Sequence, residues 1–325
     1  MMRFDRITLG RQAKEFGFVS DTFEKVCRLA DVLSFMESDP LLADCLALKG
    51  GTAINLTIFD LPRLSVDIDL DFSKDVSRES MLAEREEINK HIQKYMTASG
   101  YTLSLKSKQY HALDSFVYEY VNAGGMKDNL KIEINYMLRC HVLPVSRRPV
   151  YLPWNDQEIT VLSVDPMEIF SAKTVALLNR SAPRDLYDMF NMQKYGLFDE
   201  TQEQFFRKCV MLYAAIVSET VPEHFDLNGI DNISAQKIKT DLTPVLRRGE
   251  HFDLASVQKQ VKDYLADILK PEDMELSFWQ AFAEEKYQPD LLFDDADILS
   301  RIEHHPMALW KCGGRPSKQK DTPKL

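Results

Sequence analysis

The sequence predicts an α+β fold, in which a mixed sheet with flanking helices is followed by a helical C-terminal domain. Two observations lead to this prediction. The front of the chain contains the strictly alternating segment SVDIDLDF at residues 65–72 and several further strand-like segments. From Asp165 onward, apolar residues recur at helical spacing instead. The 325 residues suffice for two domains of about 150 residues each, and we place them at 1–164 and 165–312.

In the front domain, helices and strands are expected to alternate. Helical spacing predicts a helix at 22–37, which ends at the breaker Ser38-Asp39-Pro40, and another at 77–98. A short helix at 52–59 follows Gly50-Gly51. The turn-rich connector 124–129 indicates a hairpin between its flanking strands. The expected strands are 45–50, 65–72, 101–107, 115–122, 130–137 and, after a proline-punctuated loop at 144–153, an edge strand at 158–163.

The second domain begins with a helix start that has an identifiable mechanism. Asp165 can cap the helix, Pro166 suits its first position, and Glu168 stands where a capping box places its acidic residue. The segment 313–325 is basic and rich in glycine and proline, so we expect a disordered tail. The expected helices of this domain are 165–180, 183–194, 202–219, 254–269 and 272–286.

Composition and charge exclude several classes of protein. Forty basic and fifty acidic side chains give a net charge of −10, which argues against a generally cationic surface but permits a local basic groove. The apolar runs are too short to span a bilayer, and the N-terminus lacks the features of a signal peptide. Five scattered cysteines without a CxxC pair argue against a disulfide framework or a zinc ribbon. We therefore expect a soluble cytoplasmic protein without a membrane partner.

The strand at 65–72 carries the most informative chemistry. Side chains alternate between the faces of a strand, so Asp67, Asp69 and Asp71 share one face, and each lies about 7 Å from the next. This repulsion is tolerable on a solvated outer face, and it is useful if a divalent cation lies between the carboxylates. Because Mg²⁺ prefers one or two carboxylates together with substrate phosphates, the pattern favours magnesium, with Mn²⁺ as the alternative.

Two further segments add to this strand. If the strand at 130–137 pairs with it, Glu133 can supply a third carboxylate; otherwise Glu133 belongs to a polar surface ladder. Gly50 and Gly51 precede a short helix, where glycine allows close backbone approach and free N–H groups attract phosphate. A plain tight turn would look the same. Neither a Walker A loop nor a Rossmann fingerprint is present.

Taken together, these parts follow the order found in nucleotidyltransferases of the polymerase-β type. The segment GGTAINL at 50–56, followed by Arg63-x-Ser65-x-Asp67-x-Asp69, resembles the AbiEii/AbiGii toxin family of nucleotidyltransferases. The resemblance covers residues 45–195. It extends to two later motifs, Lys173-x-x-Ala176-Leu177-x-x-Arg180 and Pro183-Arg184-Asp185-Leu186-Tyr187-Asp188-Met189.

The resemblance implies a role for each matching residue. Asp67 and Asp69, with Glu133 as a third carboxylate, would bind the metal, and Glu133 is also a candidate general base. Lys173 would neutralise the leaving pyrophosphate, and Asp185 would position that lysine or help to hold the base or the metal. The residues expected to bind the nucleotide are Gly50, Gly51, Thr52, Arg63, Ser65, Lys173 and Arg180.

The resemblance also implies the biological setting. Such proteins are toxins of type IV toxin–antitoxin or abortive-infection systems, typically encoded beside a winged-helix antitoxin. Characterised relatives add nucleotides from an NTP to the 3′ end of tRNA, so we expect tRNA as the acceptor and basic residues near the cleft. Two alternatives remain open. The acceptor can be a protein hydroxyl, or the chain can be a nucleotide-binding regulator without turnover.

Overall fold

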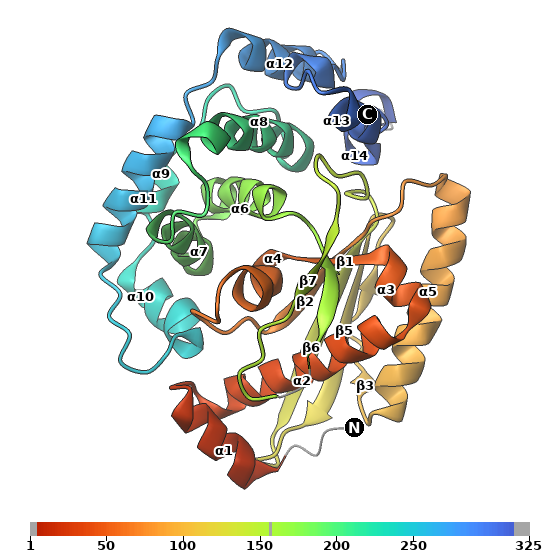
Figure 1. Cartoon of the computed structure of the whole chain (residues 1–325), viewed down its shortest axis with the longest axis vertical. Coiled ribbons are helices and arrows are strands. Elements are labelled where there is room, and N and C mark those ends of the chain that lie inside the picture. Colours follow the sequence, from red (N-terminus) through yellow and green to blue (C-terminus); the bar gives the residue numbers. More distant parts are fainter. Residues whose placement is uncertain (1–4, 156–157, 315–325) are drawn as a thin grey trace, which may run out of the picture.

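The computed structural model describes residues 5–155 and 158–314, and it confirms the predicted α+β fold (Figure 1). An eight-stranded mixed sheet has the order β3-β5-β6-β2-β1-β8-β7, and β4 pairs with β5. The strands are β1 Leu46–Lys49, β2 Asp67–Phe72, β3 Thr102–Leu103, β4 Lys108–Gln109, β5 Leu113–Val121, β6 Lys127–Asn135, β7 Ser146–Pro149 and β8 Thr160–Ser163.

Helices cover both faces of this sheet. The helices of the front region are α1 Arg6–Glu15, α2 Ser20–Ser38, α3 Pro40–Cys45, α4 Gly50–Ala53 with its π-helical continuation η1 Ile54–Ile58, and α5 Arg78–Ala98. In Figure 1, α2, α3 and α5 lie on one side of the sheet, and α4 lies on the other side together with the later helices. The apolar face of β2, formed by Ile68, Leu70 and Phe72, is buried. Its aspartates therefore point to the side of α4.

The helical region wraps around α4. Helices α6 and α8 pack against each other, and α7 packs on α6 and α11. Figure 1 shows this region at the left and top of the molecule. Its helices are α6 Pro166–Arg180, α7 Pro183–Lys194, α8 Glu200–Val217, α9 Asn228–Asp231, α10 Ala235–Lys237, α11 Leu254–Ile268, α12 Asp273–Ala283, α13 Ala296–Ile302 and α14 Pro306–Leu309, with the short turns η2 Ile238–Leu242, η3 Thr243–Val245, η4 Pro289–Leu291 and η5 Trp310–Gly314.

Most expected elements are present, but the sheet edge is different from the prediction. The strand expected at 158–163 is β8, and it lies between β1 and β7 rather than at the edge. The edge strand is β7, inside the segment that its prolines indicated to be a loop. Proline is compatible with an edge strand because no neighbouring strand requires its missing N–H. Residues 315–325, most of the expected tail, lie outside the described residues.

The capping box at the start of α6 is also wrong in one half. Asp165 caps the helix as expected, with its carboxylate accepting from the Met167 N–H at 2.8 Å. Glu168 does not reach back to this cap. Its buried carboxylate accepts instead from the N–H groups of Val142 and Leu143, both at 2.9 Å, and from the Tyr213 hydroxyl. Glu168 therefore connects the end of the front region to the helical region.

Candidate functional site

The strand register brings the predicted carboxylates together. β2 runs antiparallel to β1 and parallel to β6, with Asp69 opposite Lys49 on one side and opposite Glu133 on the other. The pairing that Glu133 required is therefore present. Asp71, on the same face of β2, is buried and forms an ion pair with Lys49 at 2.5 Å. Glu133 is paired with Lys131, the next residue on its own face of β6, at 2.8 Å.

Asp67 and Asp69 differ from these two carboxylates because they have no cationic partner. Within residues 5–155 and 158–314, neither forms an ion pair, and both are half-buried. Burial raises the pKa of Asp69, and the neighbouring charges of Asp67 and Glu133 raise it further, while Lys49 and Lys173 act in the opposite direction. Two adjacent carboxylates without an ion-pair partner form a site that a cation would stabilise.

The backbone at the start of α4 approaches the acidic face of β2 closely. Gly50 has a φ of +66°, and a Cβ atom at this position would lie 2.6 Å from Asp69 Oδ2. At Gly51, a Cβ atom would lie 2.9 Å from Ser65 Oγ and 3.0 Å from a guanidinium nitrogen of Arg63. Only glycine therefore fits between the start of α4 and the acidic face of β2. The tight turn and the close approach that the sequence indicated are both present.

Thr52 and Arg63 lie in different surroundings from those expected of nucleotide ligands. Thr52 is completely buried, and its hydroxyl donates to the backbone carbonyl of Asp67, which fixes α4 onto β2. Arg63 is only 2% exposed, and its guanidinium donates to both carboxylate oxygens of Asp188, at 2.7 and 2.6 Å. Both side chains are engaged by other groups of the protein, and their expected contact with a nucleotide stays a prediction.

The motifs of α6 and α7 form a second, closed cluster of charges. Lys173 is buried, and its Nζ lies 2.9 Å from Asp185 and 3.2 Å from Asp188. Arg180 donates to Asp185 from Nε at 2.7 Å and from Nη2 at 3.0 Å. Burial opposes ionisation of Asp185, but Lys173 and Arg180 outweigh it and hold the pKa of this carboxyl below its usual range.

The two aspartates of α7 also keep Lys173 charged. Burial also opposes the charge of Lys173, and Asp188 and Asp185 outweigh it, so the pKa of the lysine is raised and it stays protonated. Two of its three ammonium protons are directed to carboxylates, which leaves one for a ligand. The contact between Lys173 and Asp185 fits the expected positioning role of Asp185.

No complete metal site is formed by the protein alone. Among the described residues, no group of three histidine, cysteine, aspartate or glutamate side chains has the arrangement of a metal site. Glu133 is engaged with Lys131, whereas Asp67 and Asp69 are free. The donor set therefore fits a hard cation held by two carboxylates and completed by substrate phosphates and water, as Mg²⁺ prefers.

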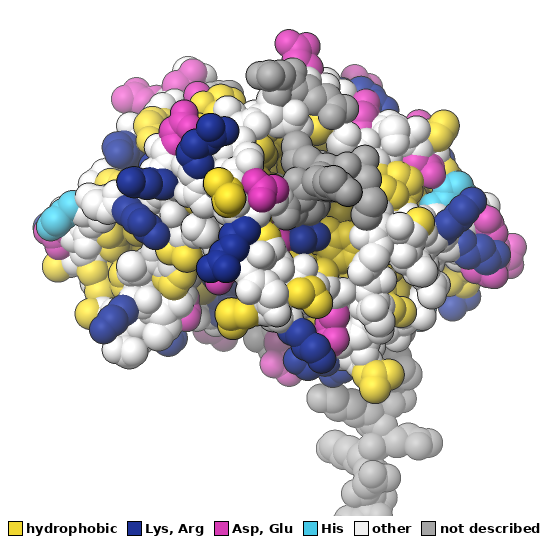
Figure 2. All heavy atoms as spheres, turned by 90° about the horizontal axis from the view of Figure 1, so that it is seen from below, with side chains coloured by type: hydrophobic (Ala, Val, Ile, Leu, Met, Phe, Trp, Pro, Cys, Tyr) yellow, Lys and Arg dark blue, Asp and Glu magenta, His cyan; other side chains and the backbone are white. Residues whose placement is uncertain are grey.

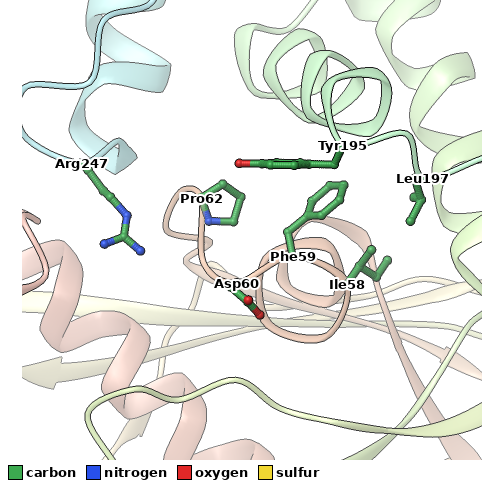
Figure 3. A pocket seen from close by; sticks show the side chains of 7 residues that line it. All are labelled: Ile58, Phe59, Asp60, Pro62, Tyr195, Leu197 and Arg247. Carbon is green, nitrogen blue, oxygen red and sulfur yellow. The ribbon is translucent and has the colours of Figure 1, made fainter.

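A cavity of about 550 Å³ lies away from these residues, at the far end of α4 and η1. Figure 3 shows Phe59, Pro62 and Tyr195 close together on one side of it and Arg247 on the other. None of the predicted site residues lines this cavity. We therefore place the candidate site at the Gly50 turn and the acidic face of β2.

The surface charge is uneven. Figure 2 shows Lys and Arg side chains gathered mainly on the left half of the face seen from below, the side on which α10 and α11 lie in Figure 1. Exposed basic residues of the segment next to α10 are Lys237, Lys239 and Arg248. A protein with a net charge of −10 thus still presents local positive charge.

A search of the helices in residues 5–155 and 158–314 found none with the length and apolar character of a membrane span.

Two unpaired aspartates beside a glycine turn suit an enzyme that binds a metal and a nucleotide, and the family comparison gives the class as nucleotidyltransferase. More particularly, the chain belongs to the AbiEii family of nucleotidyl transferase toxins of type IV toxin–antitoxin systems, whose family model matches residues 33–284. This confirms the family that the sequence motifs indicated.

The comparison of structures agrees in fold. MenT4, a nucleotidyltransferase toxin from Mycobacterium tuberculosis, superposes with a TM-score of 0.63 at 15% sequence identity, over 94% of this chain and 99% of that chain. At this identity the similarity supports the fold alone. No curated protein sequence matches the chain.

Arg184, at the start of α7, stands beside Asp185 in the family motif, and the sequence left open whether it acts at the site or forms an interhelical salt bridge. In the structure its Nε donates to the backbone carbonyl of Asp241 at 2.7 Å, and it forms no ion pair with any described residue. Burial and the charge of Arg63 lower the pKa of its guanidinium, and the nearby carboxylate of Asp67 acts in the opposite direction. Its position next to Asp185 in the motif was the signal that could have identified it.

Proposed function

We propose that this toxin transfers a nucleoside monophosphate from an NTP to the 3′ end of tRNA in a magnesium-dependent reaction. The observation that carries this proposal is the unpaired state of Asp67 and Asp69 on the face that Gly50 approaches. Structural carboxylates nearby, such as Asp71 and Asp188, are all neutralised by a cation. Asp67 and Asp69 are therefore the carboxylates available to a metal and its nucleotide.

The chemistry is a phosphoryl-group displacement. The oxygen of the acceptor 3′-hydroxyl attacks the α-phosphorus and forms a new phosphodiester bond. The bond between the α-phosphorus and the bridging oxygen to the β-phosphorus breaks, and pyrophosphate leaves with the electron pair. The hydroxyl proton passes to Glu133 or to solvent. When bound, Mg²⁺ supplies electrostatic stabilisation of the phosphates and lowers the pKa of the attacking hydroxyl.

The chain's own residues would supply positioning and charge. Gly50 and Gly51 let the start of α4 approach Asp69 and Ser65 closely, so the first N–H groups of α4 would lie beside phosphate oxygens bound at the acidic face. Lys173 keeps one ammonium proton for the pyrophosphate, where a fixed cation stabilises the developing negative charge. Asp185 and Asp188 hold this lysine in place through the contacts at 2.9 and 3.2 Å. Arg180 touches the same Asp185 from a more exposed position, so it can reach substrate only at the rim.

The family setting supports two partners beyond the NTP. As a type IV toxin, the protein is expected to have a cognate antitoxin, and we propose a winged-helix protein in this role. The local basic surface near α10 supports an RNA acceptor, because phosphodiester backbones bind to clustered Lys and Arg. We propose the cytoplasm as the compartment in which both partners are met.

The test uses total cellular tRNA, Mg²⁺ and each of the four α-labelled NTPs. Label on tRNA, lost with Lys173→Met, is the expected result and names the nucleotide. Lys173→Met keeps the aliphatic bulk, and a thermal melt of this variant establishes that it folds. Asp69→Asn serves as a second inactive variant, because it leaves the buried cluster of α6 and α7 intact.

Other outcomes would replace the proposal. Label on protein rather than RNA would show that the acceptor is a protein hydroxyl. Retained nucleotide binding with no label on any acceptor would indicate a regulator without turnover. Transfer that persists after chelation of divalent metal would contradict the assignment of Asp67 and Asp69 as metal ligands.

A further inference from the structure

The basic side chains around the acidic face of β2 fall into two groups. The members of the first group are all paired with a carboxylate, and each such pairing reduces the charge available to a substrate. These paired side chains are Lys49 with Asp71, Arg63 with Asp188, Lys131 with Glu133, Lys173 with Asp185 and Asp188, and Arg180 with Asp185. The second group consists of Arg184, which pairs with no carboxylate among the described residues.

Arg184 is nevertheless a fixed residue. It lies in the first turn of α7, next to Asp185, and it is half-buried. Its Nε donates to the carbonyl of Asp241 at 2.7 Å. This bond uses one of five guanidinium N–H donors, so both terminal nitrogens remain available. A side chain that is ordered by a neutral backbone oxygen keeps its full positive charge.

The segment that anchors Arg184 is itself attached next to the site. Leu64 N donates to Val245 O at 2.8 Å, and Arg63 forms an isolated bridge with Leu246. These contacts place the turns η2 and η3 directly beside the residues that precede β2. Arg184 is thereby held near Asp67, and its guanidinium lies within the electrostatic influence of Arg63, Asp67, Asp241 and Asp188. The positive charges of Lys49, Lys173 and Arg180 interact electrostatically with the other aspartate, Asp69.

We propose that Arg184 contacts a phosphate group of the substrate at the Asp67 end of the site. This inference rests on the proposed nucleotidyl transfer and adds a ligand to it. A planar guanidinium with two free terminal nitrogens matches two phosphate oxygens, whereas the charge of each paired cation of the site is already opposed by a carboxylate. The phosphate belongs either to the triphosphate of the NTP or to the backbone of the acceptor, and the two sources are separable by experiment.

Three substitutions distinguish contact with phosphate from a structural role. Arg184→Gln places an amide nitrogen at the bond position of Nε, so it preserves a donor for Asp241 O and removes the charge. Arg184→Lys keeps the charge and loses the fork. The matched control is Arg301→Gln, because the Arg301 guanidinium also donates only to a backbone carbonyl, that of Val142, at 3.1 and 2.9 Å.

Binding is measured separately for the two phosphate sources. Equilibrium dialysis with each α-labelled NTP and Mg²⁺, without acceptor, reports the triphosphate. Filter binding of total tRNA, without NTP, reports the backbone. We expect Arg184→Gln to weaken one of these two affinities by about 10- to 100-fold, Arg184→Lys to restore part of it, and Arg301→Gln to leave both unchanged. Thermal melts should show equal folding of all variants.

Each result decides the inference independently of turnover. A loss confined to NTP assigns the phosphate to the triphosphate, and a loss confined to tRNA assigns it to the acceptor. If Arg184→Gln binds both as wild type does, the inference is overturned, even when label transfer confirms the enzyme. If wild type transfers no label but Arg184→Gln lowers NTP binding, the proposed reaction fails and the phosphate contact stands. If wild type binds neither ligand, both fail.

Discussion

Two pairs of aspartates lie close to one another on different elements, Asp67 and Asp69 on β2 and Asp185 and Asp188 on α7. Each pair has the spacing that places both side chains on one face, two residues apart in a strand and three apart in a helix. The pair on α7 is buried and neutralised by Lys173, Arg63 and Arg180. The pair on β2 is half-buried and has no cation of its own among the described residues.

This difference in pairing indicates that the aspartates of α7 stabilise the fold, whereas those of β2 are available to bind a ligand. A carboxylate enclosed by cations stabilises the fold and has few lone pairs left for a ligand. A carboxylate that has lost part of its hydration without gaining a partner is a cost to the fold, and a bound cation can relieve it. The opposite pKa shifts of Asp185 and Asp69 express this contrast. We therefore expect stability to depend on the pair of α7 and activity to depend on the pair of β2.

The largest effect on stability should come from breaking the pair of Arg63 and Asp188. Asp188→Ala leaves a 2% exposed guanidinium without its two acceptors. We expect a loss of about 3–5 kcal/mol in the free energy of unfolding, measured by urea denaturation. The control is Asp263→Ala, which removes an exposed partner of Lys259 and should cost less than about 0.5 kcal/mol. Similar losses for both variants would contradict the distinction between buried and exposed pairs.

A smaller effect is expected at the glycine turn. Gly50→Ala must accommodate a positive φ of 66° and a Cβ atom 2.6 Å from Asp69 Oδ2, so we expect about 1–3 kcal/mol and weaker nucleotide binding. Gly100→Ala is the matched control, because Gly100 has a φ of +83° and open space around it. It should show only the backbone part of the cost and normal nucleotide binding. If Gly50→Ala binds NTP normally, the close approach has no part in the site.

The smallest expected effect is on the pH dependence of the free energy of unfolding, which should differ between the two pairs of aspartates. The raised pKa of Asp69 means that its ionisation destabilises the fold, so Asp69→Asn should gain stability over wild type as the pH rises above 3.8. The lowered pKa of Asp185 gives the opposite sign: its stabilisation is complete above 3.8 and is lost as the pH falls further, so the penalty of Asp185→Asn should shrink there. Urea titrations across an acidic pH series measure both. If the stability of Asp69→Asn and of Asp185→Asn, each relative to wild type, changed in the same direction with pH, the two pairs of aspartates would not differ as we describe.

The sequence predicted the acidic face of β2 because period-two alternation assigns side chains to faces without knowledge of tertiary contacts. It left the pairing with the strand of Glu133 open, and the structure supplies both the pairing and the register that places Asp69 opposite Glu133. The motif of α6 places Lys173 and Arg180 seven positions apart, which is one face of a helix, and both contact Asp185.

Long-range packing explains what the sequence did not predict. Arg63 and Asp188 are 125 positions apart, and nothing in either local pattern indicates that they pair or that Arg63 is buried. The anchor of Arg184 is a backbone carbonyl 57 positions away, which has no residue signature. The edge strand β7 was hidden by prolines that are compatible with pairing on one side only.

One variant tests the central claim directly, because Asp69→Asn removes one charge of the unpaired pair and leaves its shape. Label transfer from an α-labelled NTP to tRNA and the free energy of unfolding are measured on the same preparation. We predict that transfer falls by about 100-fold or more, while stability at neutral pH is unchanged or higher. Transfer at the wild-type rate, or a loss of stability comparable to that of Asp188→Ala, would contradict the assignment of Asp69 to catalysis.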